Sequence, residues 1–192
     1  MRIPALLVAL TGLLASGVLA QQQQSEPERF TAAAISKGGP RSAAGASQVD
    51  IVINRWSTPQ QTERLVTTLK EKGAEAMLDV LRDMEPVGTI HAPGRIGYQL
   101  RYAYQEPLPE GGRRIFLATD RPIGAWEAAN QLRSLDYPFT YIELRLDDQG
   151  KGEGKLALAT KIDVSTSGRV IELVNYATHP VQLNNVRRTG SG

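Results

Sequence analysis

The stretch RIGYQLRYAYQEPLPEGGRRIFLATD, residues 95–120, decides the fold. Apolar and polar side chains alternate over residues 95–104, which is typical of a β-strand with one buried face. PLPEGG at 107–112 carries the Pro and Gly that favour a turn, and RRIFLATD at 113–120 is a second candidate strand. We therefore expect an antiparallel hairpin. Its first strand is predicted to place Tyr98, Leu100, Tyr102 and Tyr104 on one face, and Gln99, Arg101 and Ala103 on the other.

Similar strand patterns recur on both sides of this hairpin, separated by turn-like sequences. DQGKGEG at 148–154 is expected to be a Gly-rich connection, not a nucleotide loop, because a strand and not a helix follows it. The last four strands are joined by short turns and should form an antiparallel meander. The predicted strands, about eight in total, are 49–56, 87–92, 95–104, 113–120, 139–147, 155–164, 169–177 and 180–188.

Two helices are expected between the first two of these strands. Residues 57–73 begin with Thr58 as a good N-cap, and Gln61 completes a capping box. Gly73 suits a left-handed C-cap, and residues 74–84 follow as a second amphipathic segment. The predicted fold class is therefore α+β. It is an antiparallel sheet, either a sandwich or a partly closed barrel, with a helical hairpin inserted after the first strand.

The N-terminus has the pattern of a secretory signal peptide. Arg2 precedes an apolar run, and Val18-Leu19-Ala20 is a small-residue cleavage site, so residues 1–20 are expected to be removed. The run is shorter than the ~20 apolar residues that a membrane span needs, so we expect no stable span after cleavage. An exported chain without cysteine fits a bacterial periplasm or the extracellular space.

Composition divides the remaining chain into two parts. Residues 21–47 are rich in Gln, Ser, Ala, Gly and Pro, and such a segment has too little apolar surface to offset its conformational entropy. We expect a disordered, low-complexity linker there. Residues 48–192 carry regular strand and helix patterns and have the length of a single globular domain.

The composition also excludes several classes of function. The 192 residues contain no Cys and two His, which leaves no material for a zinc finger, a disulfide framework or a Cys nucleophile. We expect neither a metal site nor a cofactor. A net charge of +2 is too small for nucleic-acid binding. The chain has no G-x-S-x-G, H-E-x-x-H or Walker sequence.

The segment with the most chemical potential is ATDRPIGAWEAANQLRSLDYPFTYIELR, residues 118–145. It connects two strands, and long connections in compact domains often carry function. In one interpretation it forms a pocket lined by Trp126, Tyr137 and Tyr141, with Arg121 or Arg145 orienting a polar ligand. In a second, Asp120 and Glu127 are an acid/base pair. In a third, the role is structural: Trp126 plugs the end of a barrel, and Asp120 and Arg121 pin the connection by ion pairs.

Two stretches carry a resemblance. VGTIHAPGRIGYQLRYA at 87–103 and ATDRPIGAWEAANQLRSLDYPFTYIELRLDDQGKGEGKLALATKI at 118–162 resemble a set of exported bacterial proteins of unknown function. The resemblance covers most of residues 50–188. It implies export and a single domain, and it transfers no catalytic residue.

Together these observations predict an exported, periplasmic or secreted, non-catalytic protein. It would bind a small molecule or an envelope protein, or be associated with the envelope in another way. The alternative is a carboxylate-dependent hydrolase that uses Asp120 and Glu127.

Overall fold

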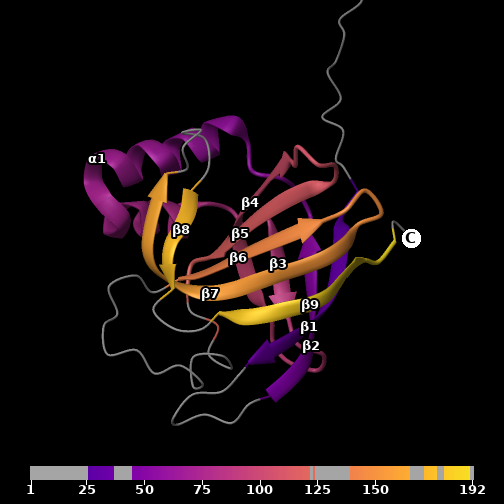
Figure 1. Cartoon of the computed structure of the whole chain (residues 1–192). Coiled ribbons are helices and arrows are strands. Elements are labelled where there is room, and N and C mark those ends of the chain that lie inside the picture. The colour runs from indigo at the N-terminus through magenta and orange to yellow at the C-terminus, as the bar shows by residue number, and fades with distance from the viewer. Residues whose placement is uncertain are drawn as a thin grey trace, which may run out of the picture.

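A computed structural model of the protein describes residues 26–36, 45–121, 123, 139–164, 171–176 and 180–190. These ranges contain nine β-strands and one α-helix, shown in Figure 1. In chain order the elements are β1 (Glu28–Ser36), β2 (Gly45–Ile53), α1 (Pro59–Asp83), β3 (Gly88–His91), β4 (Tyr98–Pro107), β5 (Arg113–Thr119), β6 (Thr140–Leu146), β7 (Lys151–Val164), β8 (Ile171–Tyr176) and β9 (Val181–Arg188).

The sheet closes into an antiparallel barrel. Among the described strands, eight form a ring in the order β1-β2-β3-β4-β5-β6-β7-β9, and β9 returns to pair with β1. The choice between a sandwich and a partly closed barrel is thereby settled in favour of a closed barrel. The prediction of a four-strand C-terminal meander is wrong at its last step, because β9 pairs with β7 and β1, not with β8. β8 pairs with the far half of β7 outside the ring.

Aliphatic side chains fill the interior of the barrel. The cluster draws on every strand of the ring and includes Phe30, Ile51, Ile90, Leu100, Ile115, Leu117, Ile142, Leu144, Leu156 and Leu183. Each of these is nearly inaccessible to solvent. Alternate residues of each strand point inward, so the interior is a packed core and not a chamber.

The first strand corrects the prediction of a linker over residues 21–47. β1 pairs with β2 along its full length and with β9 on its other side. Phe30, Ala32 and Ala34 are buried in the barrel, although composition alone predicted that this stretch could not form a core. Two paired edges satisfy its backbone hydrogen bonds, and small alanines suffice where larger side chains from other strands fill the interior. Residues 1–25 and 37–44 lie outside the described residues.

A β-bulge corrects the predicted faces of β4. The register of β4 on β5 shifts between Leu100 and Tyr102, leaving Arg101 as the extra residue. A bulge reverses which side chains point inward beyond it. Leu100 and Ala103 consequently lie in the barrel core, whereas Tyr102 and Tyr104 lie on the outer surface against α1.

The helical insertion is confirmed, but it follows the second strand because β1 precedes the strand that the sequence placed first. Thr58 and Gln61 form the predicted capping box, and Gly73 (φ 84°) interrupts the helix. Both segments bury apolar side chains against the outer face of β4, β5 and β6, and Figure 1 shows α1 along that side of the barrel. In the described part of the chain, no helix has the length and apolarity that a membrane crossing demands.

Glycines in β7 permit close approach between strands. This strand begins within the predicted Gly-rich connection, and its register on β9 shifts between Gly152 and Gly154. A Cβ atom at Gly152 would stand 1.8 Å from the carbonyl oxygen of Arg145 on β6, and one at Gly154 would stand 2.6 Å from that of Glu143. Glycine at such positions lets a barrel strand bend tightly.

We predict that Gly152→Ala lowers the free energy of unfolding by about 1–3 kcal/mol or more, because the backbone of β6 must move to admit the methyl group. Gly45→Ala is the matched control, since a Cβ there meets no atom within 4 Å. Urea denaturation of both variants measures the effect. Equal stabilities for the two variants would contradict the close approach.

Candidate binding site

The structure describes four of the predicted site residues: Asp120, Arg121, Tyr141 and Arg145. Glu127, Trp126 and Tyr137 lie outside the described residues, so neither the acid/base pair nor the aromatic pocket can be placed as a whole. Tyr141 and Arg145 lie on the same outer face of β6 but four residues, about 13 Å, apart along the strand. Arg145 is exposed and pairs with Glu110, also exposed, at 3.2 Å.

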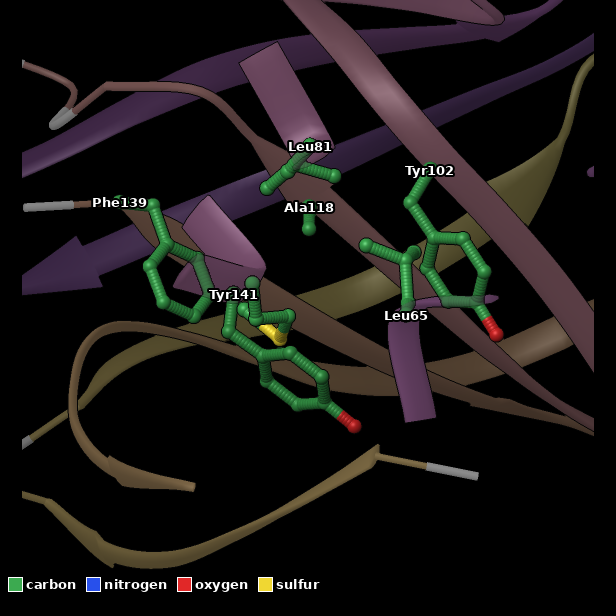
Figure 2. Close-up of a pocket in the computed structure, with 7 residues that line it drawn as sticks. Leu65, Leu81, Tyr102, Ala118, Phe139 and Tyr141 are labelled. Atoms are coloured by element: carbon green, nitrogen blue, oxygen red, sulfur yellow. The ribbon is translucent and has the colours of Figure 1, made fainter. Parts of the chain in front are cut away.

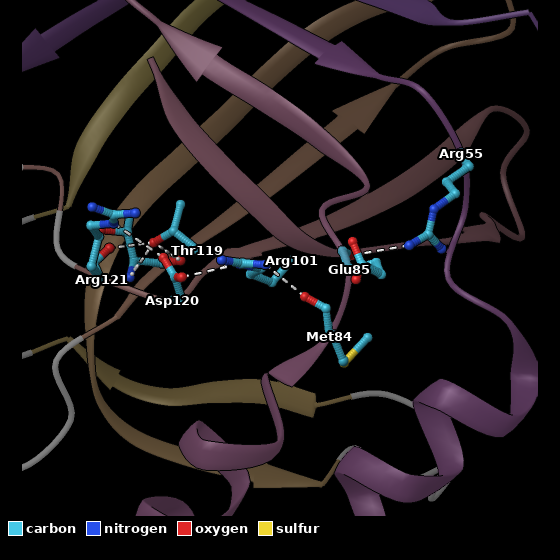
Figure 3. Close-up of polar contacts among 8 residues, drawn as sticks. Arg55, Met84, Glu85, Arg101, Thr119, Asp120 and Arg121 are labelled. Carbon is cyan, nitrogen blue, oxygen red and sulfur yellow. Dashed lines mark hydrogen bonds and ion pairs between the residues drawn. The ribbon is translucent and has the colours of Figure 1, made fainter. Parts of the chain in front are cut away.

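Asp120 and Arg121 do meet, in an ion-pair cluster at the end of β5 (Figure 3). Arg101 Nε donates to Asp120 Oδ2 at 3.0 Å, and Arg101 Nη1 donates to the carbonyl oxygen of Met84 at 2.8 Å. Arg121 Nε donates to Asp120 Oδ1 at 3.3 Å. The Asp120 side chain is only 11% exposed. This cluster ties the bulge of β4 to the end of β5 and to the residue that follows α1, as the structural interpretation expects.

Two buried threonines hold the ends of the connection that follows β5. Thr119 Oγ1 donates to the carbonyl oxygen of Arg121 at 2.5 Å and accepts from the backbone N–H of Thr140 at 3.0 Å. Thr140 Oγ1 accepts from the backbone N–H of Ile123 at 3.1 Å. The start of β6 is thereby fixed to the end of β5.

Tyr141 lines a small apolar cavity between α1 and the barrel, shown in Figure 2. Its volume is about 10 Å³, roughly the space of one water molecule. Such a cavity is a packing defect and too small for a ligand. Its lining residues are Leu65, Met77, Leu81, Tyr102, Ala118, Phe139 and Tyr141.

The hydroxyl of Tyr102 is buried in this layer. Burial raises the pKa of its hydroxyl well above the ordinary value, and the hydrogen bond with Thr62 opposes this only in part. Tyr102 Oη contacts Thr62 Oγ1 at 3.4 Å. The neutral form is therefore held in the folded state, where the ring stacks on Tyr104 at a centroid distance of 6.4 Å.

A second polar cluster lies at the opposite end of the barrel, which we call the Arg113 end. Arg113 Nη1 and Nη2 donate to Glu28 Oε1 and Oε2 at 3.2 and 2.5 Å. Nη1 also donates to Gln105 Oε1 at 2.6 Å. β1 and β5 stand four strands apart in the ring, so this bidentate pair crosses the barrel. Arg188 Nε adds a third contact to Glu28, at 3.2 Å.

Two aromatic rings complete this cluster. The Arg113 guanidinium lies 5.8 Å from the centroid of Phe30 and 6.0 Å from that of Trp56. Cation–π contact and the bidentate geometry both favour one fixed orientation of the guanidinium. The cluster forms a polar layer over this end of the hydrophobic core. In it Arg113 is held by Glu28, Gln105 and the two rings.

A polar groove opens beside this layer. Its volume is about 290 Å³, and it is lined by Gly112, Arg113, Asp147, Asp148, Gln149, Gly150 and Arg188. Asp148 Oδ1 accepts from the backbone N–H of Gly112 at 2.6 Å. Asp147 Oδ1 accepts from the N–H groups of Gln149 and Lys151 at 2.8 and 2.9 Å. The groove therefore has fixed walls. Among the described residues no His, Asp and Glu are grouped in a way that could hold a metal ion.

Two features of the sequence hid this cluster. Glu28 lay within the predicted linker, and Arg113 looked like an ordinary charged residue after a turn. The alternation of the strand could have revealed it. Arg113 lies two residues before Ile115 and four before Leu117, both of which are buried, so its side chain is on the inward face of the strand. A charge at an inward position near a strand end demands a partner, and that requirement could have pointed to Glu28.

We predict that Asp120→Asn lowers the free energy of unfolding by about 1–3 kcal/mol, because Arg101 and Arg121 lose a charged acceptor in a half-buried setting. Asp79→Asn is the control: Asp79 pairs with Arg82 on the exposed side of α1 and should change stability by less than about 0.5 kcal/mol. Chemical denaturation measures both variants. A fully stable Asp120→Asn protein would argue against the structural role.

We also predict a loss of stability in alkali that depends on Tyr102. The unfolded chain ionises this hydroxyl above about pH 10, whereas the folded chain retains the proton. The free energy of unfolding should then fall by up to about 1.4 kcal/mol per pH unit above that value. Tyr102→Phe should remove this part of the loss, and Tyr104→Phe should retain it. Parallel pH profiles for Tyr102→Phe and the parent protein would contradict the prediction.

Comparison of the chain with protein-family models, with curated proteins and with solved structures finds no match. The resemblance of residues 87–103 and 118–162 to exported bacterial proteins therefore stays a prediction. The candidate binding site consequently stands on geometry: a rigid polar groove at the Arg113 end of a closed barrel.

Proposed function

We propose that this protein is an exported, non-catalytic binding protein that holds a hydrophilic group of an envelope partner in the groove at the Arg113 end. The observation that carries the proposal is the groove itself, a concave polar surface built on the fixed network of Glu28, Arg113 and Arg188. Preorganised polar groups of this kind bind with little loss of side-chain entropy.

The dense packing of the barrel interior favours a binding site on the surface of the protein. Ligand pockets for small molecules measure roughly 300–1,000 Å³, and the cavity beside Tyr141 is about 10 Å³. Aliphatic side chains occupy the barrel axis. The groove, at about 290 Å³, has room for a single polar group of a partner such as an amide or a sugar ring.

The chemistry of the groove also supports binding. Arg188 Nε pairs with Glu28 Oε2 at 3.2 Å, and the same arginine lines the groove. Asp147 and Asp148 each use Oδ1 for backbone contacts. A group with both donors and acceptors complements this mixture better than a free ion of either sign, because two arginines and two aspartates are among the lining residues.

The hydrogen bonds that Asp120 accepts favour a non-catalytic role for this residue. Its carboxylate is bound by Arg101 and Arg121 on both oxygens, whereas a general base needs an oxygen that can reach a substrate proton. The hydrolase interpretation gains no support from this arrangement, and we do not propose it.

Export is tested by the mass of the mature chain. Expressed with its full N-terminus in a Gram-negative host, the protein is expected in the periplasm with Gln21 as its first residue, because residues 1–20 have the features that signal peptidase recognises. Intact-mass measurement of the periplasmic and cytoplasmic fractions gives the answer. Full-length protein retained in the cytoplasm would refute the export part of the proposal.

Binding is tested by site-specific photo-crosslinking in the same cells. A photoreactive amino acid at Gln149, in the groove, should give a defined adduct, and the same group at Lys72, on the exposed side of α1, should not. Arg188→Gln should weaken the adduct at position 149 without changing the far-UV circular dichroism. Equal labelling at positions 149 and 72, or none at either, would overturn the assignment of the groove.

A further inference from the structure

One edge of the barrel wall is open at the end opposite Arg113. β2 pairs with β1 along Gly45–Ile53, but β3 pairs with β2 only along Asp50–Ile53. In the described ranges, no strand pairs with the other side of residues 45–49. The hairpin of β1 and β2 therefore extends beyond β3, below it in Figure 1.

The open edge is short, but it carries none of the residue types that usually block pairing. Natural edge strands commonly carry Lys, Pro or a bulge that blocks a further strand. Here the sequence is GASQV, Gly45 to Gln48 are all exposed, and the register of β1 on β2 is continuous. β9 supports the back of the hairpin by pairing with Ala33, Ala34 and Ile35, so the edge is held in a strand conformation.

A large exposed hydrophobic residue adjoins the same edge. Ile96 is 95% exposed, a unique case among the large apolar side chains that the structure describes. It belongs to the loop that follows His91, and His91 is the last residue of β3 to pair with β2, opposite Asp50. The loop therefore leaves the sheet at the point where the open edge begins.

We propose that two copies of this chain associate through this edge, β2 to β2 and antiparallel, with a two-fold axis near Ser47. An antiparallel edge pair between identical strands is self-complementary. It would place Ser47 opposite its counterpart and Ala46 opposite Gln48. None of these side chains is charged, so no like charges oppose each other, and a strongly charged partner would find no complement along the edge.

The pairing would also bury the exposed side chain of Ile96. In this arrangement the second β2 strand is in line with β3 and starts beside the loop that carries Ile96, so the partner's Gly45 and Ala46 come next to that loop. These small residues leave space for the isoleucine side chain, which loses its contact with water. Edge pairing and apolar burial then stabilise the same arrangement.

The dimer would join two surface grooves. A shallow groove of about 410 Å³ lies on the outer face of β9, β1 and β2, and Ala33, Ala46, Gln48 and Arg187 are among its lining residues. Pairing at β2 brings the two copies of this groove together across the axis. The Arg113 end points away from the axis in each copy, so dimerisation and binding at that end are independent.

The test measures the molecular mass of the mature protein over a dilution series by light scattering and native mass spectrometry. The shared edge is short, so we expect a dimer that dissociates on dilution. Ser47→Lys and Ser47→Asp should each weaken the dimer about fivefold or more, because like charges face each other across the axis. An equimolar mixture of the two variants should restore the dimer as a heterodimer.

Two controls make the result specific. Glu75→Lys changes an exposed residue of α1 and should leave the dimer intact, whereas Ile96→Ser should weaken it. Position 47 is exposed, so the melting temperature of the dissociated variants should match that of the parent protein. A monomer at every concentration, or a dimer that both charge variants leave unchanged, would overturn the proposal without affecting the groove at the Arg113 end.

Discussion

The hydrogen-bonded seam between β1 and β9 is the constraint on which the rest of the structure depends. Without it the sheet would have two long exposed edges, and the aliphatic faces of its strands would have no common interior. With it, each strand of the described ring has two neighbours, and inward residues from opposite walls pack against each other. The pair of Glu28 and Arg113 reinforces the seam from inside, because it links the start of β1 to the far wall and, through Arg188, to the end of β9.

Sequence patterns predicted correctly those elements that interactions between near neighbours in the chain stabilise. The hairpin at 95–120 became β4 and β5, and the capping box at Thr58 was confirmed, because turn chemistry and helix capping act over a few residues. The interruption at Gly73 follows from the same kind of reasoning. These features depend on backbone preferences that neighbouring residues settle almost alone.

Predictions failed where distant parts of the chain decide the outcome. Composition excluded residues 28–36 from the core, but pairing with β2 and β9 supplies the backbone partners that make an alanine-rich strand stable. The bulge at Arg101 left no signature in the alternation of residues 95–104, and the contacts of Arg101 there, with Asp120 and Met84, join residues that are far apart in sequence. The cluster at the Arg113 end was missed for the same reason: sequence separation hides that residues 28, 113 and 188 meet.

The seam also sets the order of events in folding. It joins Phe30 to Arg188, so nearly the whole chain must leave the ribosome before the ring can close. Contacts of such long sequence separation form slowly, and synthesis at roughly 5–20 residues per second gives the incomplete chain many seconds in an open state. During that interval β1 has only β2 as a neighbour, and the aliphatic faces of the finished strands stay open to solvent. A barrel closed by its last strand is thus a fold with a built-in delay, in which the first strand waits for the last.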